Sequence, residues 1–213
     1  MTANVPPQSE AAKLPDEAIA DQRTRMILYA SLGHALTQWQ HVETAMYFIA
    51  HCLMGTEHRI SSTVFFQIRS AEAKLALLDR LVIAKLPTKM WAKGGKWKMI
   101  TTEVRGAIDF RNCLAHFELT EIPDGSLATP PTKYKVVLSP HHLDAHTSRS
   151  GEVDALTIET IEHNSKSLRK TGFLLMYFLI DHVPDLERGL SLLPPAHKQL
   201  LDSLRQRPRP KGL

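Results

Sequence analysis

Hydrophobic residues recur at steps of three and four positions along three long stretches of the chain that contain no proline. These stretches are 16–86, 88–122 and 141–183. Proline lacks an amide proton and clashes with the preceding helical turn, so long helices are confined to segments without it. Steps of three and four place side chains on one face of an α-helix. The pattern therefore predicts a mostly helical protein.

The first stretch predicts two helices. One has an apolar stripe over residues 28–53, and Gly55 supplies its end because glycine readily adopts the conformation that terminates helices. The other has a stripe over residues 65–82, with a bend expected at Ser70. It ends before Pro87, since the residue that precedes a proline avoids the helical region.

The other two stretches predict a third and a fourth helix. The third begins after the glycines at 94 and 95 and carries its stripe over residues 97–114. One arginine, Arg111, stands on this otherwise apolar stripe and needs an explanation. The fourth helix begins at Thr157, a favourable N-cap residue, and carries its stripe over residues 158–179. Its C-terminal half is apolar on nearly all sides, so we expect it to be the most buried helix.

Residues 120–153 interrupt the helical pattern. Asp124 begins an Asp-Gly turn signal, and Val136 and Leu138 alternate with polar neighbours. Such alternation is typical of a β-strand. We therefore expect a small β-hairpin or a long loop inserted between the third and fourth helices.

Four long helices with one local insertion predict an all-α fold, an antiparallel four-helix bundle followed by a short C-terminal helix. We expect a single domain over residues 16–205, because 213 residues suit one domain of ordinary size. Residues 1–15 and the basic, proline-rich residues 206–213 are expected to be flexible.

Composition narrows the class of protein. With 43% hydrophobic and 23% charged residues the chain matches a typical globular protein. Its longest strongly apolar run, residues 173–180, is far short of a membrane span, and its N-terminus lacks the apolar core of a secretory signal. Two cysteines are too few for a disulfide framework, which favours the reducing cytoplasm. We therefore expect a cytoplasmic protein without a membrane partner.

Residues 111–116, near the end of the third predicted helix, read Arg-Asn-Cys-Leu-Ala-His. The segment resembles the Arg-x4-6-His motif of the HEPN superfamily, helical bundles that include many metal-independent endoribonucleases. Four residues separate Arg111 from His116, and Asn112 stands where the family often has a polar residue. The likeness in overall layout covers residues 16–183, with the motif at the end of the third helix.

The residue types suit cleavage of RNA without a metal or another cofactor. Arginine offers a fixed fork of donors that matches phosphate oxygens, and histidine transfers protons near neutral pH. The resemblance implies that Arg111 binds the scissile phosphate, Asn112 positions the reacting groups and His116 transfers protons. The products would be a 2′,3′-cyclic phosphate and a 5′-hydroxyl. It also implies a toxin or defence role, with a nucleotidyltransferase-type antitoxin as a further partner.

On one helix, Arg111 and His116 are splayed by about 140° and separated by about 7.5 Å along the axis. Two third helices that meet about a two-fold axis would bring arginine and histidine from both chains onto one phosphate. The resemblance likewise implies a homodimer, because the family is typically dimeric. We therefore expect a composite site.

A structural role for the same residues stays open. Arg111 could pair with Glu43 or Asp109, and His116 could cap the last carbonyls of its helix. Glu43 is also the candidate residue that would orient Arg111 in an active site. The alternative function is a non-catalytic HEPN-like module that binds RNA, a nucleotide or a partner protein.

A second candidate is a group of lysines beside tryptophans in the connection between the second and third helices. Basic residues interleaved with aromatic ones suit single-stranded nucleic acid, through phosphate contacts and base stacking. Ordinary solvated lysines at a helix end are the alternative. The residues proposed to extend an RNA-binding surface are Lys89, Lys93, Lys96, Lys98 and Trp97.

The segment His141-His142-Leu143-Asp144-Ala145-His146 has imidazoles and a carboxylate at spacings that metal ligands use. A polar surface loop is the simpler interpretation, because no second pair of ligands stands out elsewhere. We therefore predict no metal site, and keep a metal-dependent hydrolase at this loop as the weakest alternative.

Overall fold

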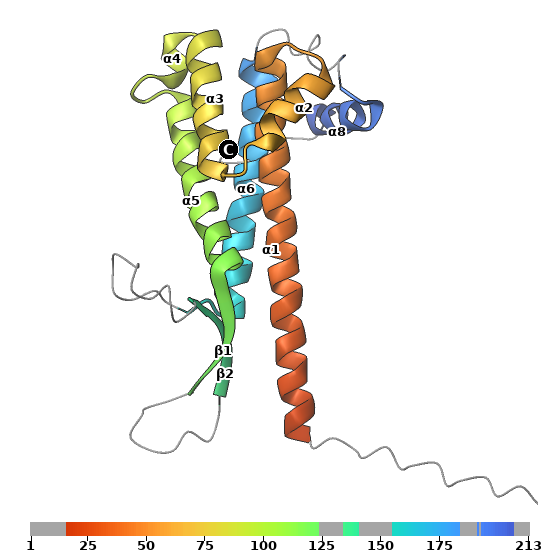
Figure 1. The fold of residues 1–213 in the computed structure, drawn as a ribbon, viewed down its shortest axis with the longest axis vertical. Helices are drawn as coiled ribbons and strands as arrows, with labels where there is room; N and C mark the ends of the chain where they lie inside the picture. Colours follow the sequence, from red (N-terminus) through yellow and green to blue (C-terminus); the bar gives the residue numbers. More distant parts are fainter. Residues whose placement is uncertain (1–15, 124–133, 141–154, 184–190, 192, 207–213) are drawn as a thin grey trace, which may run out of the picture.

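The computed structural model describes residues 16–123, 134–140, 155–183, 191 and 193–206. Helices make up most of it, and a two-stranded antiparallel hairpin lies between the fifth and sixth labelled helices (Figure 1). The elements are α1 Asp16–Met54, α2 His58–Gln67, α3 Ala71–Lys85, α4 Thr88–Trp91, α5 Lys96–His116, β1 Phe117–Pro123, β2 Tyr134–Pro140, α6 Ile158–His182 and α8 Pro195–Gln206. The predicted antiparallel bundle, its insertion and its short C-terminal helix are confirmed.

The helices α1 and α6 make the most extensive contact in the bundle, and α3 and α5 pack beside them (Figure 1). Gly172 of α6 lies where these two helices meet, and a Cβ atom there would be in ordinary contact with the backbone of α1, 3.7 Å from the nitrogen of Val42. The main core fills the upper part of the bundle as drawn, around Phe48, Leu78 and Phe178. A smaller core joins the lower part of α1 to the hairpin.

Local signals explain where the helices begin and end. Gly55 follows α1 with a φ of 64°, a backbone conformation that glycine adopts without strain. Thr157 caps α6, accepting a hydrogen bond from the backbone nitrogen of Thr160 at 3.3 Å. The predicted bend at Ser70 is a full break instead. Ser70 caps a separate helix, α3, and its hydroxyl accepts a hydrogen bond from the backbone nitrogen of Ala73 at 3.2 Å.

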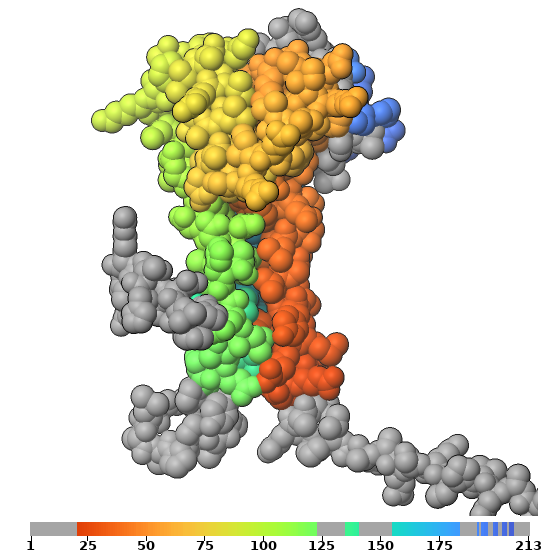
Figure 2. Space-filling model, in the orientation of Figure 1, coloured from red at the N-terminus to blue at the C-terminus, as the bar shows by residue number. Residues whose placement is uncertain are grey.

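The helix α3 covers only part of α5. Its first turn lies beside Asn112, where the two helices are bonded, and the last turn of α5 continues past it (Figure 1). In Figure 2 the segments α2 and α3 cover the upper part of this face, whereas α1 and α5 form the surface below them. Ala115 is exposed although it lies on the same face of α5 as the buried Trp97, about five turns earlier, and Arg111 is half-buried. The bundle therefore has four helices at one end and fewer at the other.

The strands β1 and β2 pair antiparallel, with Phe117 opposite Pro140. The hairpin begins at once after α5, three residues before the start predicted for the insertion. Val136 and Leu138 are buried in the smaller core, but Val137 between them is buried as well, so burial does not alternate along β2 as the sequence pattern predicts. Arg25 of α1 pairs with Glu121 of β1.

Several predictions fall on residues that the structure does not describe. These are the flexible N-terminal segment 1–15, the turn at Asp124, the histidines from His141 to His146 and most of the basic tail 206–213. Within the described ranges, no helix has the length and apolarity needed to cross a membrane.

Candidate functional site

A bonded group of side chains joins the end of α5 to the start of α3. The Nη1 atom of Arg111 donates a hydrogen bond to Oδ1 of Asn112 at 3.3 Å. Asn112 then donates from Nδ2 to Oε1 of Glu72, the second residue of α3, at 3.2 Å. The hydroxyl of Ser70 donates to the other Glu72 oxygen at 2.9 Å. We call Arg111, Asn112 and Glu72 the α3–α5 cluster.

The surroundings of Glu72 keep its carboxyl group charged. Its pKa is lowered from the ordinary value chiefly by a hydrogen bond from its own backbone amide, and next by the hydroxyl of Ser70. Burial opposes these two effects by raising the pKa, and the side chains of Asn112 and Arg111 each lower it by less than burial raises it. At neutral pH the cluster therefore contains a carboxylate that accepts hydrogen bonds from two helices.

Glu43, the residue predicted to orient Arg111, has a different partner. Its carboxylate accepts a hydrogen bond from Lys74 of α3, with 2.5 Å between Oε1 and Nζ. Lys74 is only 6% exposed, and its ammonium group lies 5.2 Å from the ring centre of Phe65. A buried ammonium group needs a counter-ion, which explains the pair. The carboxylate linked to Arg111 is that of Glu72, through the side chain of Asn112.

The sequence contains a signal for Glu72 that the prediction of a bend at Ser70 hides. Serine followed by an acidic residue within one turn is typical of a helix start, since the serine caps the helix and the carboxylate faces its positive end. Interpreted so, Ser70 begins α3 and Glu72 is in its first turn.

His116 is the last residue of α5 and is exposed. The backbone of α5 ends beside it, where the nitrogen of Phe117 donates to the carbonyl of Cys113. Among the described residues no hydrogen bond joins His116 to Arg111. A single chain therefore presents the two motif residues on different sides of α5, as the helical spacing predicts.

Cys113 lies inside the motif and its thiol stays protonated near neutral pH. Burial raises the pKa of this thiol, and the nearby carboxylate of Asp109 raises it further. A thiolate, not a thiol, is the reactive nucleophile. Cys113 is therefore a half-buried packing residue, as its place beside the apolar stripe predicts.

A hollow of about 330 Å³ lies between α3 and α5, next to the cluster. Three carboxylates border it, those of Glu72, Asp79 and Asp109, together with the guanidinium of Arg105. Arg105 lies 3.8 Å from the carboxylate of Asp79. The hollow next to Arg111 thus has more carboxylates than cations at its border, which disfavours the binding of phosphate.

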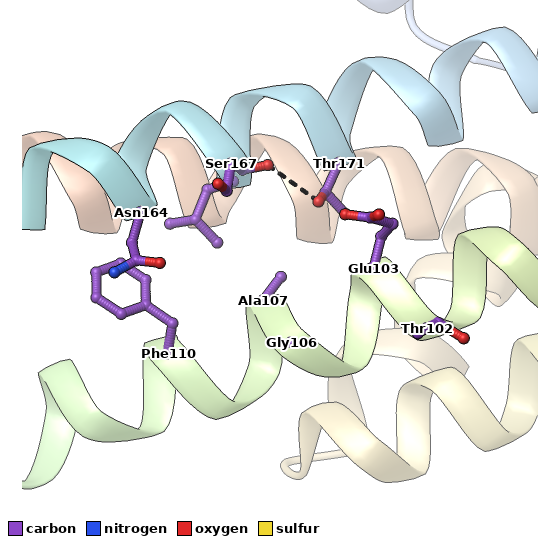
Figure 3. A pocket seen from close by; sticks show the side chains of 9 residues that line it. Thr102, Glu103, Gly106, Ala107, Phe110, Asn164, Ser167 and Thr171 are labelled. Carbon is purple, nitrogen blue, oxygen red and sulfur yellow. Dashed lines mark hydrogen bonds between the residues drawn. The ribbon is translucent and has the colours of Figure 1, made fainter. Parts of the chain in front are cut away.

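A second hollow, of about 320 Å³, lies between α5 and α6 and is shown in Figure 3. Its walls are mostly small or uncharged, with Glu103 as the charged side chain at one end and Phe110 at the other (Figure 3). Phe110 and Arg111 are about 100° apart on α5, so this hollow opens on a different face from the motif. It offers no cation for a phosphate group.

The lysines proposed to extend an RNA-binding surface are all exposed, namely Lys89, Lys93, Lys96 and Lys98. Trp97 is not available for stacking on a base, because it is only 2% exposed. Its Nε1 donates to Oδ1 of Asp79 at 2.7 Å, and its ring lies 5.0 Å from that of Phe178. The prediction that Trp97 stacks on bases is therefore wrong, since the ring fills the core between α3, α5 and α6.

The described part of the chain contains no cluster of three or more histidine, cysteine or acidic side chains that could hold a metal ion. The histidines His141, His142 and His146 lie outside that part, so the alternative of a metal site there is neither supported nor contradicted.

Comparison with known proteins adds no relative to this geometry. No family model, curated protein or solved structure matches the chain. The argument for function therefore rests on the α3–α5 cluster, on the exposed His116 and on the resemblance of residues 111–116 to a known motif.

Proposed function

We propose that the protein is a metal-independent endoribonuclease of the toxin or defence type, similar to the HEPN superfamily. One observation carries the proposal. Arg111 donates a hydrogen bond to the side-chain oxygen of Asn112 where α3 begins, and the next turn of α5 presents His116 to solvent. A guanidinium, an amide and an imidazole thus follow one another along the exposed end of one helix.

Each residue has a role that its chemistry permits. Arg111 binds the non-bridging oxygens of the scissile phosphate, and Asn112 donates to the same group. An imidazole accepts the proton of the 2′-hydroxyl as that oxygen attacks phosphorus, and an imidazolium donates a proton to the departing 5′-oxygen. The products are a 2′,3′-cyclic phosphate and a 5′-hydroxyl. His116 supplies these proton transfers.

The splayed arrangement of Arg111 and His116 favours a site that two chains complete. An apolar surface suited to a second copy lies on the same part of the molecule. Tyr29 and Leu36 of α1 are 57% and 37% exposed. They follow Arg25 by four and eleven residues, so they lie on the same side of α1 as Arg25, which pairs with Glu121 of β1. We therefore propose a homodimer, and the resemblance adds a nucleotidyltransferase-type antitoxin as a further partner.

The exposed lysines between α3 and α5 and in the first turn of α5 have a supporting role in this proposal. Lys89, Lys93, Lys96 and Lys98 would contact the phosphates of an RNA that extends beyond the cleavage site. They would contribute affinity that falls as salt rises, and no chemistry.

The test is cleavage of RNA by the purified protein in EDTA, compared with His116→Ala. Loss of a general acid or base is expected to lower the rate by about a hundredfold or more. The matched control is His163→Ala, because His163 is also exposed but lies on α6. Equal cleavage by the wild type and His116→Ala, or cleavage that EDTA abolishes, would contradict the proposal.

The second candidate function is a non-catalytic module that binds RNA, a nucleotide or a partner protein. The acidic border of the hollow beside Arg111 favours the partner-protein form of this module, because Glu72, Asp79 and Asp109 oppose the approach of a phosphate. The same experiment separates the two functions. Binding of RNA by wild type and His116→Ala alike, with no cleavage by either, is the result expected of this module.

A further inference from the structure

The carboxylate of Glu72 occupies one of the donors that the proposed site offers to a phosphate group, the side-chain amide of Asn112. Asn112 donates to Glu72 at 3.2 Å, and the charge of Arg111 helps to lower the pKa of this carboxyl group. A carboxylate and a phosphate accept hydrogen bonds from guanidinium and amide groups in the same manner. A phosphate that binds Asn112 therefore competes with Glu72 for the same amide.

The fold does not require this carboxylate. Glu72 is exposed, and the start of α3 is already capped by Ser70, which accepts from the nitrogen of Ala73. The contact of α3 with α5 rests on buried side chains further along the helix, of which Leu75 and Leu78 are examples. Glu72 is thus placed by α3 at the α5 donors without being part of the packing between the two helices.

We propose that Glu72 is an internal competitor that sets the affinity of the Arg111–Asn112 donors for phosphate groups. A phosphate of RNA binds there by displacing the Glu72 carboxylate, which then turns into solvent. The inference rests on the proposed function, since it concerns the same donors. It makes Glu72 the residue that limits how tightly a polyanion is held.

A positioning role for Glu72 predicts a change in phosphate affinity of the opposite sign. If its hydrogen bond served to hold Asn112 in a productive orientation, neutralising Glu72 would weaken the binding of phosphate. If it competes, neutralising it strengthens binding. The direction of one change in affinity therefore separates a competitor from a positioning residue.

The experiment measures binding of a 2′-O-methylated RNA, which has no 2′-hydroxyl to react, to full-length Glu72→Gln. Glutamine keeps the shape of the side chain and its capacity to accept from Asn112, so the fold is expected to be unaffected. Removal of an exposed competing charge is expected to strengthen binding about two- to fivefold, the range that surface charge pairs usually cover. The control is Glu103→Gln, an exposed glutamate on the α5–α6 face, which loses the same charge away from the cluster.

A second measurement reports on the contact itself. The side-chain amide resonance of Asn112 is followed by NMR during a titration with inorganic phosphate. It is expected to shift in the wild type, and to shift at lower phosphate concentration in Glu72→Gln. Weaker or unchanged binding by Glu72→Gln, an equal gain in Glu103→Gln, or an Asn112 amide that phosphate does not shift in either protein would each overturn the proposal.

The outcomes keep this proposal apart from the proposed function. Tighter phosphate binding by Glu72→Gln, with no cleavage of ordinary RNA by any form of the protein, leaves the competitor in place and removes the ribonuclease. Cleavage that depends on His116, together with RNA binding that is no tighter in Glu72→Gln than in the wild type, leaves the ribonuclease in place and removes the competitor.

Discussion

The two ends of α5 differ in how many helices surround them. Near its start, Trp97 lies against α3 and α6 and is 2% exposed. Near its end, Ala115 lies about five turns later on the same face as Trp97 and is exposed, because α3 begins beside Asn112 and does not extend over the last turn. This face of α5 is thus part of the core at one end and exposed at the other, while Leu114 on a different face stays buried in the smaller core.

The difference teaches that the periodicity of a helix does not reveal how far its neighbours reach. A stripe of residues is buried only where another element covers it. At the covered end, Trp97 is part of the core, although the lysines around it in the sequence suggest an RNA-binding role. At the open end, a polar residue on the stripe, Arg111, is able to meet both a carboxylate and solvent.

The largest expected effect contrasts these two ends directly. Trp97→Ala is expected to lower the free energy of unfolding by about 3 to 5 kcal/mol, because it leaves a cavity in the core and an Asp79 oxygen without its donor. Ala115→Ser, on the same face of α5, is expected to change it by less than about 0.5 kcal/mol, as exposed substitutions usually do. Urea unfolding followed by circular dichroism measures both. Similar losses for the two variants would show that the open end is covered in solution.

An intermediate effect is expected at the buried ion pair. Glu43→Ala leaves the ammonium of Lys74 buried without its counter-ion and is expected to cost about 2 to 3 kcal/mol, below the usual range for a fully buried pair because Glu43 is half-buried. Adding Lys74→Met removes the orphaned charge and is expected to restore most of the loss. The control is Asp21→Ala, which breaks an exposed pair with Arg25.

This prediction is contradicted if Glu43→Ala and Asp21→Ala have equal effects in urea unfolding. It is also contradicted if Lys74→Met deepens the loss of stability. The first result would place Lys74 in contact with water, and the second would show that its ammonium group stabilises the fold through a partner other than Glu43.

Much of the fold could be predicted from the sequence because the signals that begin and end its helices are local. Gly55 ends α1, the pair of glycines before Lys96 precedes α5, and Thr157 begins α6. Each of these signals acts within one turn of helix and needs no knowledge of the partner. The break at Ser70 has the same local character, but the sequence predicts only a bend there because the apolar stripe continues on both sides of it.

The site could be predicted only in part. Arg111, Asn112 and His116 stand together in the sequence and keep the helical spacing that the motif predicts. Glu72 is forty residues away, and nothing in the chain tells that the start of α3 meets the end of α5. The partner of Glu43 depends in the same way on which helix lies opposite, so it could not be assigned from the sequence.

The smallest expected effect concerns the charge of Glu72 at the boundary between the two ends. The folded protein lowers the pKa of this carboxyl group below its unfolded value. The charged form therefore stabilises the fold above the unfolded pKa, and this contribution is lost as the pH falls through the folded pKa. Wild type is expected to be slightly more stable than Glu72→Gln near pH 7, and the two are expected to converge in acid. Because Glu72 is exposed, water screens its interactions and the difference is smaller than those above.

Thermal unfolding of the two proteins between about pH 3 and pH 7 measures this convergence, since the comparison cancels the titration of every other group. A difference that stays constant over this range would show that the effect of Glu72→Gln does not come from the charge. A difference that grows in acid would mean that folding raises the pKa of Glu72 instead of lowering it. Convergence combined with tighter phosphate binding by Glu72→Gln would mean that the carboxylate stabilises the fold at the expense of the site, because the same charge that its own backbone amide and Ser70 stabilise also accepts a hydrogen bond from Asn112.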